Sequence, residues 1–244
     1  MIYVDLNCDM GEGIGNEVEL MPLITSANIA CGAHAGDERT MRDVSSLARQ
    51  FGVGVGAHPG YEDREHFGRR ELAMAPTALR KLMIRQIALL RNIAAVRHVK
   101  PHGALYNLAA RDRTVAEVIA EAVWEVDRSM VLFALAGSEL VKAGRVRGLV
   151  VAQEVFADRT YQGDGSLTPR TLANAIHNDE REAVSQVLQM VQTGTVRATD
   201  GTDVKITADT ICLHGDGPNA VKFATMLRRE LGAAGITVRP FTVV

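Results

Sequence analysis

Residues that can bind metals, transfer protons or hold a polar substrate recur at the ends of short apolar runs. The first run contains Asp5, Asn7 and Asp9, which share one face because the side chains of a strand alternate with a period of two, and Glu12 follows them. Later runs end in His34 and Asp37, His58 and Tyr61, Lys100 and His102, Glu154 and Arg159, and His214 and Asp216. Parallel α/β folds build their sites at the carboxyl ends of their strands. The sequence therefore predicts one polar active site assembled from these residues.

The positions of the histidines indicate whether the sheet is open or closed. Four of the seven, His34, His58, His102 and His214, follow different strands, and their side chains can meet only if the strands curve together. This convergence favours a closed barrel over an open sheet. Taken singly, such residues also have structural roles: an aspartate before a helix can cap it, and a histidine at a strand end often donates to a backbone carbonyl.

Two kinds of chemistry fit this set of residues. Converging Asp, Glu and His side chains can hold Zn²⁺ or a similar ion and lower the pKa of its water toward about 7, and Asp5, His58 and His102 are the candidate ligands. Alternatively, the carboxylates activate water directly while Lys100, Arg159 and backbone N–H groups stabilise an oxyanion. No H-E-x-x-H motif occurs, so the spacing alone does not assign a metal.

A glycine-rich stretch follows the first predicted strand. It reads Gly11-Glu-Gly13-Ile-Gly15, which is G-x-G-x-G rather than the dinucleotide-binding G-x-G-x-x-G, and no G-x-x-x-x-G-K-[ST] motif occurs in the sequence. The sequence therefore predicts a turn that brings backbone close to a polar ligand, and no nucleotide site of its own.

The cysteines indicate neither a disulfide framework nor a zinc knuckle. Cys8, Cys31 and Cys212 are three in number and have no C-x-x-C spacing. Each is expected to be a small buried apolar side chain. Cys31, three residues before His34, is retained as a candidate nucleophile.

Short apolar runs alternate about seven times with longer stretches of helical period, the pattern of a mostly parallel sheet covered by helices. The predicted helices include Glu38 to Phe51, Thr77 to Ala95 and a long helical region from Thr168-Pro169 to near Gly194. The predicted strands are Ile2 to Asn7, Ala27 to Cys31, Val53 to Ala57, His98 to Pro101, Val131 to Ala134, Leu149 to Val155 and Thr210 to Leu213, with one more possible in Ile236 to Val244.

The alternation predicts an α/β fold, a single (β/α) barrel of seven or eight mostly parallel strands that forms one domain over residues 1–244. The segment from Thr195 to Ile206 interrupts it. Its Asp200-Gly201 pair between two β-like runs is typical of a β-hairpin, here an insertion before the seventh strand. The polar loops His58 to Ala75 and Asp158 to Ser166 are long enough to close over a ligand.

Composition limits the partners. Of 244 residues, 47% are hydrophobic and 23% are charged, which excludes disorder and coiled coil. The net charge is −2, with no long run of one sign, so neither nucleic acid nor a membrane surface is an expected partner. No apolar run reaches the roughly 18 residues of a membrane span, and the N-terminus reads directly into a strand. The expected location is the cytoplasm.

Six motifs in one order resemble those of the LamB/YcsF lactam-utilisation family, and they cover almost the whole chain. The motifs are Val4-Asp-Leu-Asn-Cys-Asp-Met-Gly-Glu-Gly13, Asn28-Ile-Ala-Cys-Gly-Ala-His-Ala-Gly-Asp37, Gly56-Ala-His-Pro-Gly-Tyr61, Lys100-Pro-His-Gly-Ala-Leu-Tyr106, Glu154-Val-Phe-Ala-Asp-Arg159 and Cys212-Leu-His-Gly-Asp216. The resemblance implies a barrel of the glycoside hydrolase/deacetylase type. It also implies a bacterial ATP-dependent 5-oxoprolinase, in which this chain acts with partner subunits B and C. ATP is then a co-substrate, with Mg²⁺ expected to accompany it, while the lactam of 5-oxo-L-proline is opened to L-glutamate.

This activity suggests roles for the residues. Asp5, His58 and His102 are expected around the lactam carbonyl, with Asp5 or a neighbouring histidine as general base, and Lys100 or His214 facing the developing negative charge. The expected contact of the substrate carboxylate is Arg159. The other predicted substrate-binding residues are Asn7, Asp9, Glu12, His34, Asp37, Tyr61, Glu154 and Asp216.

Two other functions fit the same residues. One is a metal-dependent deacetylase or amidohydrolase that acts without partners, which would lose its ion and its activity together on chelation. The other is a non-catalytic subunit that only binds the lactam, in which substitutions at the histidines would weaken binding and leave the chemical step intact.

Overall fold

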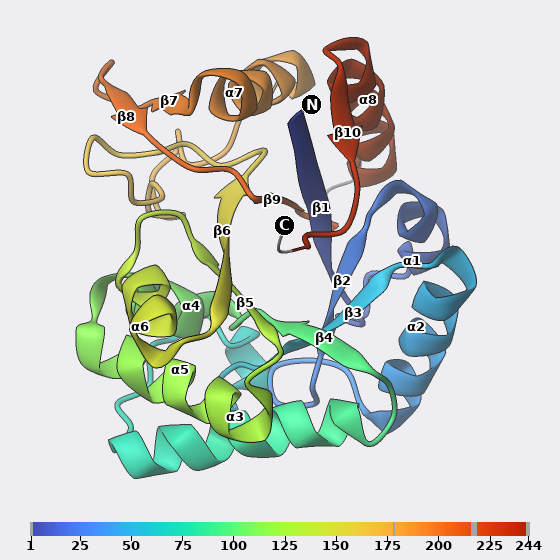
Figure 1. Ribbon diagram of the computed structural model, residues 1–244, viewed down its shortest axis with the longest axis vertical. Helices are drawn as coiled ribbons and strands as arrows, with labels where there is room; N and C mark the ends of the chain where they lie inside the picture. Colours follow the sequence, from blue (N-terminus) through green and yellow to red (C-terminus); the bar gives the residue numbers. More distant parts are fainter. Residues whose placement is uncertain (1, 178, 216–218, 243–244) are drawn as a thin grey trace.

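A closed barrel of seven parallel strands lies at the centre of the computed structural model, which describes residues 2–177, 179–215 and 219–242 (Figure 1). Around the barrel the order is β1, β2, β3, β4, β5, β6 and β9, and β9 pairs with β1 to close the sheet. The strands are β1 (Ile2–Met10), β2 (Ser26–Ala30), β3 (Gly54–His58), β4 (Val96–Val99), β5 (Val131–Leu135), β6 (Val150–Phe156) and β9 (Thr210–Leu213). The predicted parallel barrel is confirmed.

Small side chains in two of the strands make room for the polar residues inside the barrel. Both β2 and β3 are buried along their whole length, because helices cover the outer face of the sheet and polar side chains fill its interior. Gly56 of β3 shows how close this packing is. A Cβ atom built on Gly56 would lie 2.0 Å from Nε2 of His98, so the histidine ring occupies the space that a side chain at residue 56 would need.

Helices cover the outside of the barrel, with α3 and α5 packed side by side along one edge and α8 near β10 at the other (Figure 1). Asp37 caps α2 by accepting from the backbone N of Thr40 at 2.8 Å, and Gly52 ends the same helix in the left-handed region at φ 69°. The α-helices are α1 (Glu17–Leu20), α2 (Glu38–Phe51), α3 (Pro76–Arg91), α4 (Gly103–Arg111), α5 (Arg113–Asp127), α6 (Glu139–Arg147), α7 (Glu180–Thr193) and α8 (Ala220–Ala233), and the 3₁₀ helices are η1 (Met21–Leu23) and η2 (Arg64–His66).

Two further strand features lie outside the barrel. The short strand β10 (Ile236–Val238) runs parallel to the first residues of β1. It extends the sheet next to the seam, the β1–β9 pairing that closes the barrel. The predicted hairpin is also present: β7 (Thr195–Arg197) and β8 (Asp203–Lys205) pair antiparallel, with Gly201 at φ 84° in the turn between them.

The long helical region predicted from Thr168 to near Gly194 is wrong in its first half. Only α7 is helical there, and residues 168–177 form turns. The guanidinium of Arg159 donates from Nη2 to the carbonyl of Thr168 at 2.5 Å and from Nε to that of Ala175 at 3.2 Å. Arg159 lies 9 residues before Thr168 and 16 before Ala175, and its hydrogen bonds to these two carbonyls accompany a segment that folds back against it.

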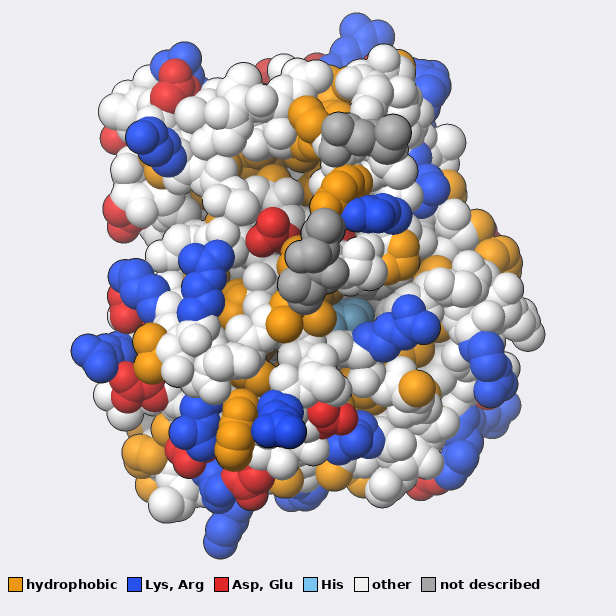
Figure 2. All heavy atoms as spheres, in the orientation of Figure 1, with side chains coloured by type: hydrophobic (Ala, Val, Ile, Leu, Met, Phe, Trp, Pro, Cys, Tyr) orange, Lys and Arg blue, Asp and Glu red, His pale blue; other side chains and the backbone are white. Residues whose placement is uncertain are grey.

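The surface carries charges of both signs. Figure 2 shows basic side chains scattered over one face with acidic ones among them. Among the described residues, no helix is long and apolar enough to cross a membrane. Among the described residues no disulfide joins the three cysteines, which are buried, as predicted, and burial raises the pKa of the Cys31 thiol to about 12. A thiol of that pKa is a poor nucleophile, so Cys31 is dropped as a catalytic candidate.

Candidate active site

Polar side chains fill the barrel in layers, and the lowest layer holds Asp5. Its Oδ1 accepts hydrogen bonds from the hydroxyls of Thr25 and Ser26, both at 2.7 Å, and its Oδ2 accepts from Thr210. Burial raises the pKa of Asp5, and these three hydrogen bonds oppose the rise. The prediction that Asp5 lies beside the histidines is therefore wrong, since its oxygens bond to these hydroxyls and it is not part of the histidine cluster. Its carboxylate ties β1 to β2 and β9 at the amino-terminal end of the barrel.

The middle layer is a network of amides. Asn28 donates from Nδ2 to Asn7 Oδ1 at 2.7 Å and to Asp9 Oδ1 at 2.8 Å, while its own Oδ1 accepts from His98 Nε2 at 2.7 Å. Asn7 in turn donates to the hydroxyl of Thr210 at 2.8 Å. Apart from Asp9, which reaches the cavity, these side chains are buried and bonded to one another, so they support the layer above and do not face a ligand.

Lys100 dominates the upper layer. Its Nζ lies 3.0 Å from Asp9 Oδ1 and 2.8 Å from Glu154 Oε1, and it donates to Cys212 Sγ at 3.1 Å. Tyr106 completes the arrangement by donating its hydroxyl hydrogen to Glu154 Oε2 at 2.5 Å. Burial alone would lower the pKa of Lys100, but Asp9, Cys212 and Glu154 raise it well above its usual value. A permanent positive charge therefore lies at the carboxyl end of the barrel.

Three histidines and a glutamate gather beside this lysine. His58 Nε2 lies 2.9 Å from His102 Nδ1, and Glu12 Oε1 lies 3.3 Å from His102 Nδ1 and 3.1 Å from His34 Nε2. The rings of His34 and His102 stack in parallel, 3.7 Å apart. The ligand atoms of these four residues all lie within 4.8 Å of one another, so this is the set within the described ranges that could hold a metal ion.

The charges in this cluster depend on one another. Burial would raise the pKa of Asp9, but the charges on His58 and Lys100 hold it well below its usual range. Burial would lower the pKa of His58, but Asp9, 3.3 Å from its Nε2, raises it above its ordinary value. Asp9 and His58 therefore form the ionised pair when only protons occupy the cluster.

The pKa values of the other members of the cluster are shifted toward their neutral forms. Burial, with the neighbouring charge on His58, lowers the pKa of His34 and of His102 to about 3. Burial and the carboxylate of Asp9 raise the pKa of Glu12. Neighbouring groups of which some have pKa values shifted toward the charged form and others toward the neutral form are typical of catalytic sites, where one group must give and another must take a proton.

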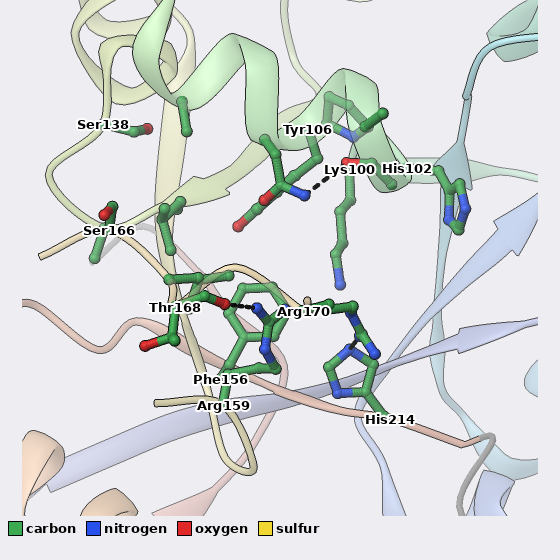
Figure 3. Close-up of a pocket in the computed structure, with 18 of the residues that line it drawn as sticks. Lys100, His102, Tyr106, Ser138, Phe156, Arg159, Ser166, Thr168, Arg170 and His214 are labelled. Carbon is green, nitrogen blue, oxygen red and sulfur yellow. Dashed lines mark hydrogen bonds between the residues drawn. The ribbon is translucent and has the colours of Figure 1, made fainter. Parts of the chain in front are cut away.

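A cavity of about 760 Å³ opens above the upper layer, a size suited to a small-molecule ligand. Figure 3 shows the side chain of Lys100 reaching into it from one wall, toward Arg170 and His214 on the opposite wall. The predicted residues that line the cavity are Asp9, Glu12, His58, Lys100, His102, Arg159 and His214.

His214 forms part of the cavity wall opposite Lys100. Its Nδ1 lies 2.7 Å from Asp158 Oδ1, and its Nε2 accepts from Arg170 Nη2 at 2.8 Å, since a guanidinium can only donate (Figure 3). Phe156 stacks on the imidazole with ring centroids 5.6 Å apart. His214 is thus oriented from both sides, and it brings the guanidinium of Arg170 to the cavity.

Other predicted residues lie elsewhere. Glu154 and Asn7 are buried beneath the cavity floor, and His34 lies behind His102. The remaining three are Asp37, an exposed helix cap, Tyr61, which is part of the apolar core, and Asp216, which falls outside the described residues.

Several residues of the site were not predicted. Tyr106 is part of a motif quoted for the family, but its hydrogen bond to Glu154 joins residues 48 positions apart, which spacing does not reveal. Arg170 and the orienting role of Asp158 were also missed. Arg170 belongs to the segment mistaken for helix, so no periodicity could have placed it at the cavity.

Comparisons with known proteins agree with one another. Residues 4–244 match the model of the LamB/YcsF family. The 5-oxoprolinase A subunit of Shouchella clausii (strain KSM-K16) is 52% identical over 249 residues, which cover 98% of each chain. That of Bacillus subtilis (strain 168) is 49% identical over 98% of this chain and 96% of its own. The crystal structure of a lactam utilization protein from Thermus thermophilus superposes with a TM-score of 0.92 at 41% identity, over 98% of this chain and 100% of that one.

Proposed function

Because the chain belongs to the LamB/YcsF family, we propose that it is the lactam-opening subunit of a 5-oxoprolinase, which hydrolyses the cyclic amide of 5-oxo-L-proline to L-glutamate. Relatives of about 50% identity over nearly the whole chain carry the name of the 5-oxoprolinase A subunit, and this supports the proposal. The observation that carries it is the buried cation of Lys100 facing a cavity whose adjoining wall holds Asp9, His58 and His102.

Hydrolysis of the lactam requires that the amide resonance be removed and that the negative charge formed on oxygen be stabilised. An amide is stabilised by resonance, and transfer of the terminal phosphoryl group of ATP to the amide oxygen would remove that resonance and provide a leaving group. Water then adds to the ring carbon, the ring C–N bond breaks as the nitrogen takes a proton, and an acyl phosphate is left. A second water adds to the carbonyl of this acyl phosphate, which places negative charge on the carbonyl oxygen before phosphate leaves. Lys100 is the group that faces this charge, and the cluster of Asp9, His58 and His102 activates the water.

The substrate carboxylate is assigned to Arg170 in place of Arg159. The guanidinium of Arg159 already donates to the carbonyls of Thr168 and Ala175, so its orientation is fixed by the backbone. Arg170 is exposed, lines the cavity and is held by His214. A guanidinium can bind a carboxylate through two parallel hydrogen bonds, which fixes the orientation of the lactam ring.

ATP and the partner subunits are part of the proposal. The sequence has no P-loop, so we expect partner subunits B and C to bind ATP with Mg²⁺ and deliver the phosphoryl group. The naming of the relatives as one subunit supports an enzyme of several chains. A reaction that consumes ATP in this way is expected in the cytoplasm.

A reconstitution tests the function. Purified chain is incubated with 5-oxo-L-proline, with and without ATP, alone and with subunits B and C, and glutamate and ADP are measured together. Both products are expected only in the full mixture. Glutamate from the chain alone without ATP, or no glutamate from the full mixture, would contradict the proposal.

Substitution of Lys100 tests the catalytic assignment in the same assay. Lys100→Met removes the charge that faces the oxyanion, and turnover is expected to fall about 100-fold or more, as when a donor to an oxyanion is removed. Lys142, an exposed lysine of α6, provides the matched control Lys142→Met, which should keep wild-type turnover. Thermal unfolding shows whether each variant is folded. A folded Lys100→Met variant with wild-type turnover would remove Lys100 from the mechanism.

Substitution of Arg170 separates binding from chemistry. Arg170→Gln removes a charge-assisted contact, so KM for the lactam should rise roughly 10-fold or more while kcat changes little. Because Arg170 is exposed, the variant should fold normally. Arg39→Gln, on the outside of α2, is the control for loss of a surface charge. An unchanged KM in Arg170→Gln would assign the carboxylate to another group.

A further inference from the structure

We infer that Glu12, His58 and His102 form a binding site for one divalent transition metal ion of the Zn²⁺ type, with its remaining coordination position open to the cavity. This inference goes beyond the proposed reaction, and it stands whether or not a lactam is the substrate, because it depends only on the arrangement of the ligand atoms.

The hydrogen bonds of the two histidines determine where their lone pairs point. His58 Nδ1 lies 2.7 Å from the backbone oxygen of Lys100, and His102 Nε2 lies 2.8 Å from that of Phe67. A carbonyl oxygen can only accept, so these two nitrogens carry the hydrogens. The other nitrogens, His58 Nε2 and His102 Nδ1, then turn their lone pairs toward each other at 2.9 Å.

Two lone pairs at this distance repel unless a positive charge lies between them. A third donor atom points to the same place, since Glu12 Oε1 lies 3.3 Å from His102 Nδ1 and 3.8 Å from His58 Nε2. A single proton can join the two nitrogens but leaves the carboxylate without a shared cation. A metal ion satisfies all three donors at once.

The distances among the three donors have the size that a metal requires. Ligand atoms at 2.0 to 2.1 Å from a tetrahedral ion are about 3.3 to 3.4 Å from one another. The three separations between Glu12, His58 and His102 are 2.9, 3.3 and 3.8 Å, close to that edge length. Backbone carbonyls already orient both imidazoles, as is usual behind metal-binding histidines.

His34 is a supporting residue and not a fourth ligand. Its ring is parallel to that of His102, with an angle of 1° and a centroid separation of 3.7 Å, so the lone pairs of the two rings run side by side and do not converge. His34 Nε2 can instead donate to Glu12 Oε1 at 3.1 Å and hold that carboxylate in place.

The coordination is therefore of the kind found in catalytic metal sites. Three protein ligands leave one position free, and Glu12, His58 and His102 line the cavity whereas His34 does not. Asp9 Oδ2, 3.3 Å from His58 Nε2, lies where it can accept a hydrogen bond from water bound to the ion. Two imidazoles and one carboxylate favour Zn²⁺ or a similar ion over Mg²⁺ or Ca²⁺, which prefer oxygen ligands alone.

Metal binding is tested on the isolated chain, without lactam, ATP or partner subunits. The chain is produced without a polyhistidine tag, because such a tag binds the same ions. It is then stripped with a chelator, titrated with Zn²⁺, and analysed for metal after dialysis. One equivalent of Zn²⁺ is expected, and Co²⁺ in its place should give the intense visible absorption of a tetrahedral site.

Variants identify the ligands. His58→Ala, His102→Ala and Glu12→Gln should each lower the affinity for Zn²⁺ by more than about 100-fold, whereas His34→Ala, which removes only a support, should lower it by roughly 10- to 100-fold. His66→Ala is the control, since this half-exposed histidine of η2 pairs with Asp63 and is not one of the four residues of the cluster, and it should bind as the wild type does.

The outcome is decided even if a ligand variant fails to fold, because the Co²⁺ spectrum of the wild-type chain reports the site directly. The inference is overturned if the folded wild type retains no stoichiometric Zn²⁺, if its Co²⁺ spectrum is that of an octahedral ion, or if folded His58→Ala and His66→Ala variants bind Zn²⁺ equally well. None of these results bears on the lactam, so the proposed reaction is judged separately by glutamate and ADP.

Discussion

Tyr106 lines the cavity and also supports the charge of Lys100 through Glu154. Replacing it by phenylalanine removes one hydrogen bond to a buried carboxylate and keeps the ring. We expect Tyr106→Phe to lower kcat roughly 10-fold, because a hydrogen bond to a charged group is worth about 1.5 to 3 kcal/mol and its loss lets Glu154 draw Lys100 away from the cavity. KM should change little. Steady-state kinetics of the reconstituted enzyme measure both quantities.

A purely structural tyrosine would give a different pattern. In that case Tyr106→Phe would unfold at a lower temperature but keep its kcat once folded. Tyr3→Phe, at an exposed tyrosine on β1 outside the cavity, controls for the loss of a hydroxyl group.

The sequence predicted which face of β1 is polar but not which of its carboxylates is at the site. Asp5, Asn7 and Asp9 do share one face, as the alternation of side chains requires. Each residue of a strand rises about 3.3 Å, so Asp5 and Asp9 are separated by about 13 Å along the strand. The depth of the site depends on where the strand ends, and β1 continues to Met10 rather than ending at Asn7. For this reason Asp9, and not Asp5, faces the cavity.

At the scale of the elements, β3 and β4 fit together through the contact of Gly56 with the ring of His98. Gly56→Ala would place a Cβ atom 2.0 Å from that ring, so His98 must move and its hydrogen bond to Asn28 must break. We expect a loss of about 1 to 3 kcal/mol in the free energy of unfolding, as for other overpacked cores. Urea denaturation of both proteins measures it.

Gly54→Ala is the matched control in the same strand. A Cβ atom at residue 54 would lie 3.5 Å from its nearest neighbour, the backbone oxygen of Thr25, which is an ordinary contact. This variant should be more stable than Gly56→Ala by about 1 kcal/mol or more. Equal stability of the two variants would show that His98 can move at no cost.

Local patterns predicted the regular elements well and the irregular ones poorly. The helix from Glu38 to Phe51 has an apolar stripe, an aspartate cap and a terminal glycine, all of which are visible in the sequence. The Asp200-Gly201 turn is equally local. Residues 168–177 differ, because their conformation depends on carbonyl groups that accept hydrogen bonds from Arg159, in another part of the chain. No pattern within the segment carries that information.

For the whole molecule, the buried polar interior predicts a loss of stability in acid. Burial, with the nearby charges of Lys100 and His58, lowers the pKa of His98 to about 3, whereas a histidine in the unfolded chain titrates near 6.5. Between these values the unfolded chain binds a proton that the folded chain excludes. The contribution of His98 is therefore complete above about pH 6.5 and is lost as the pH falls toward 3, by up to about 1.4 kcal/mol per pH unit.

Urea denaturation at a series of pH values checks this dependence. His98→Gln can still donate to Asn28 but does not titrate, so its free energy of unfolding should fall less steeply between pH 6.5 and 4 than that of the wild type. Parallel curves for wild type and His98→Gln would contradict the assignment.

The seam of the barrel also determines when the protein can fold. Asp5 of β1 accepts a hydrogen bond from Thr210 of β9, 205 residues later in the chain. At roughly 5 to 20 residues per second, the ribosome delivers β9 roughly 10 to 40 s after β1. Until then the inner carboxylates and amides of β1 remain hydrated and one of its edges stays open to pairing with other chains. The barrel therefore closes only after β9 has been made, and a cell that makes this protein must keep its earliest strand from aggregating during that interval.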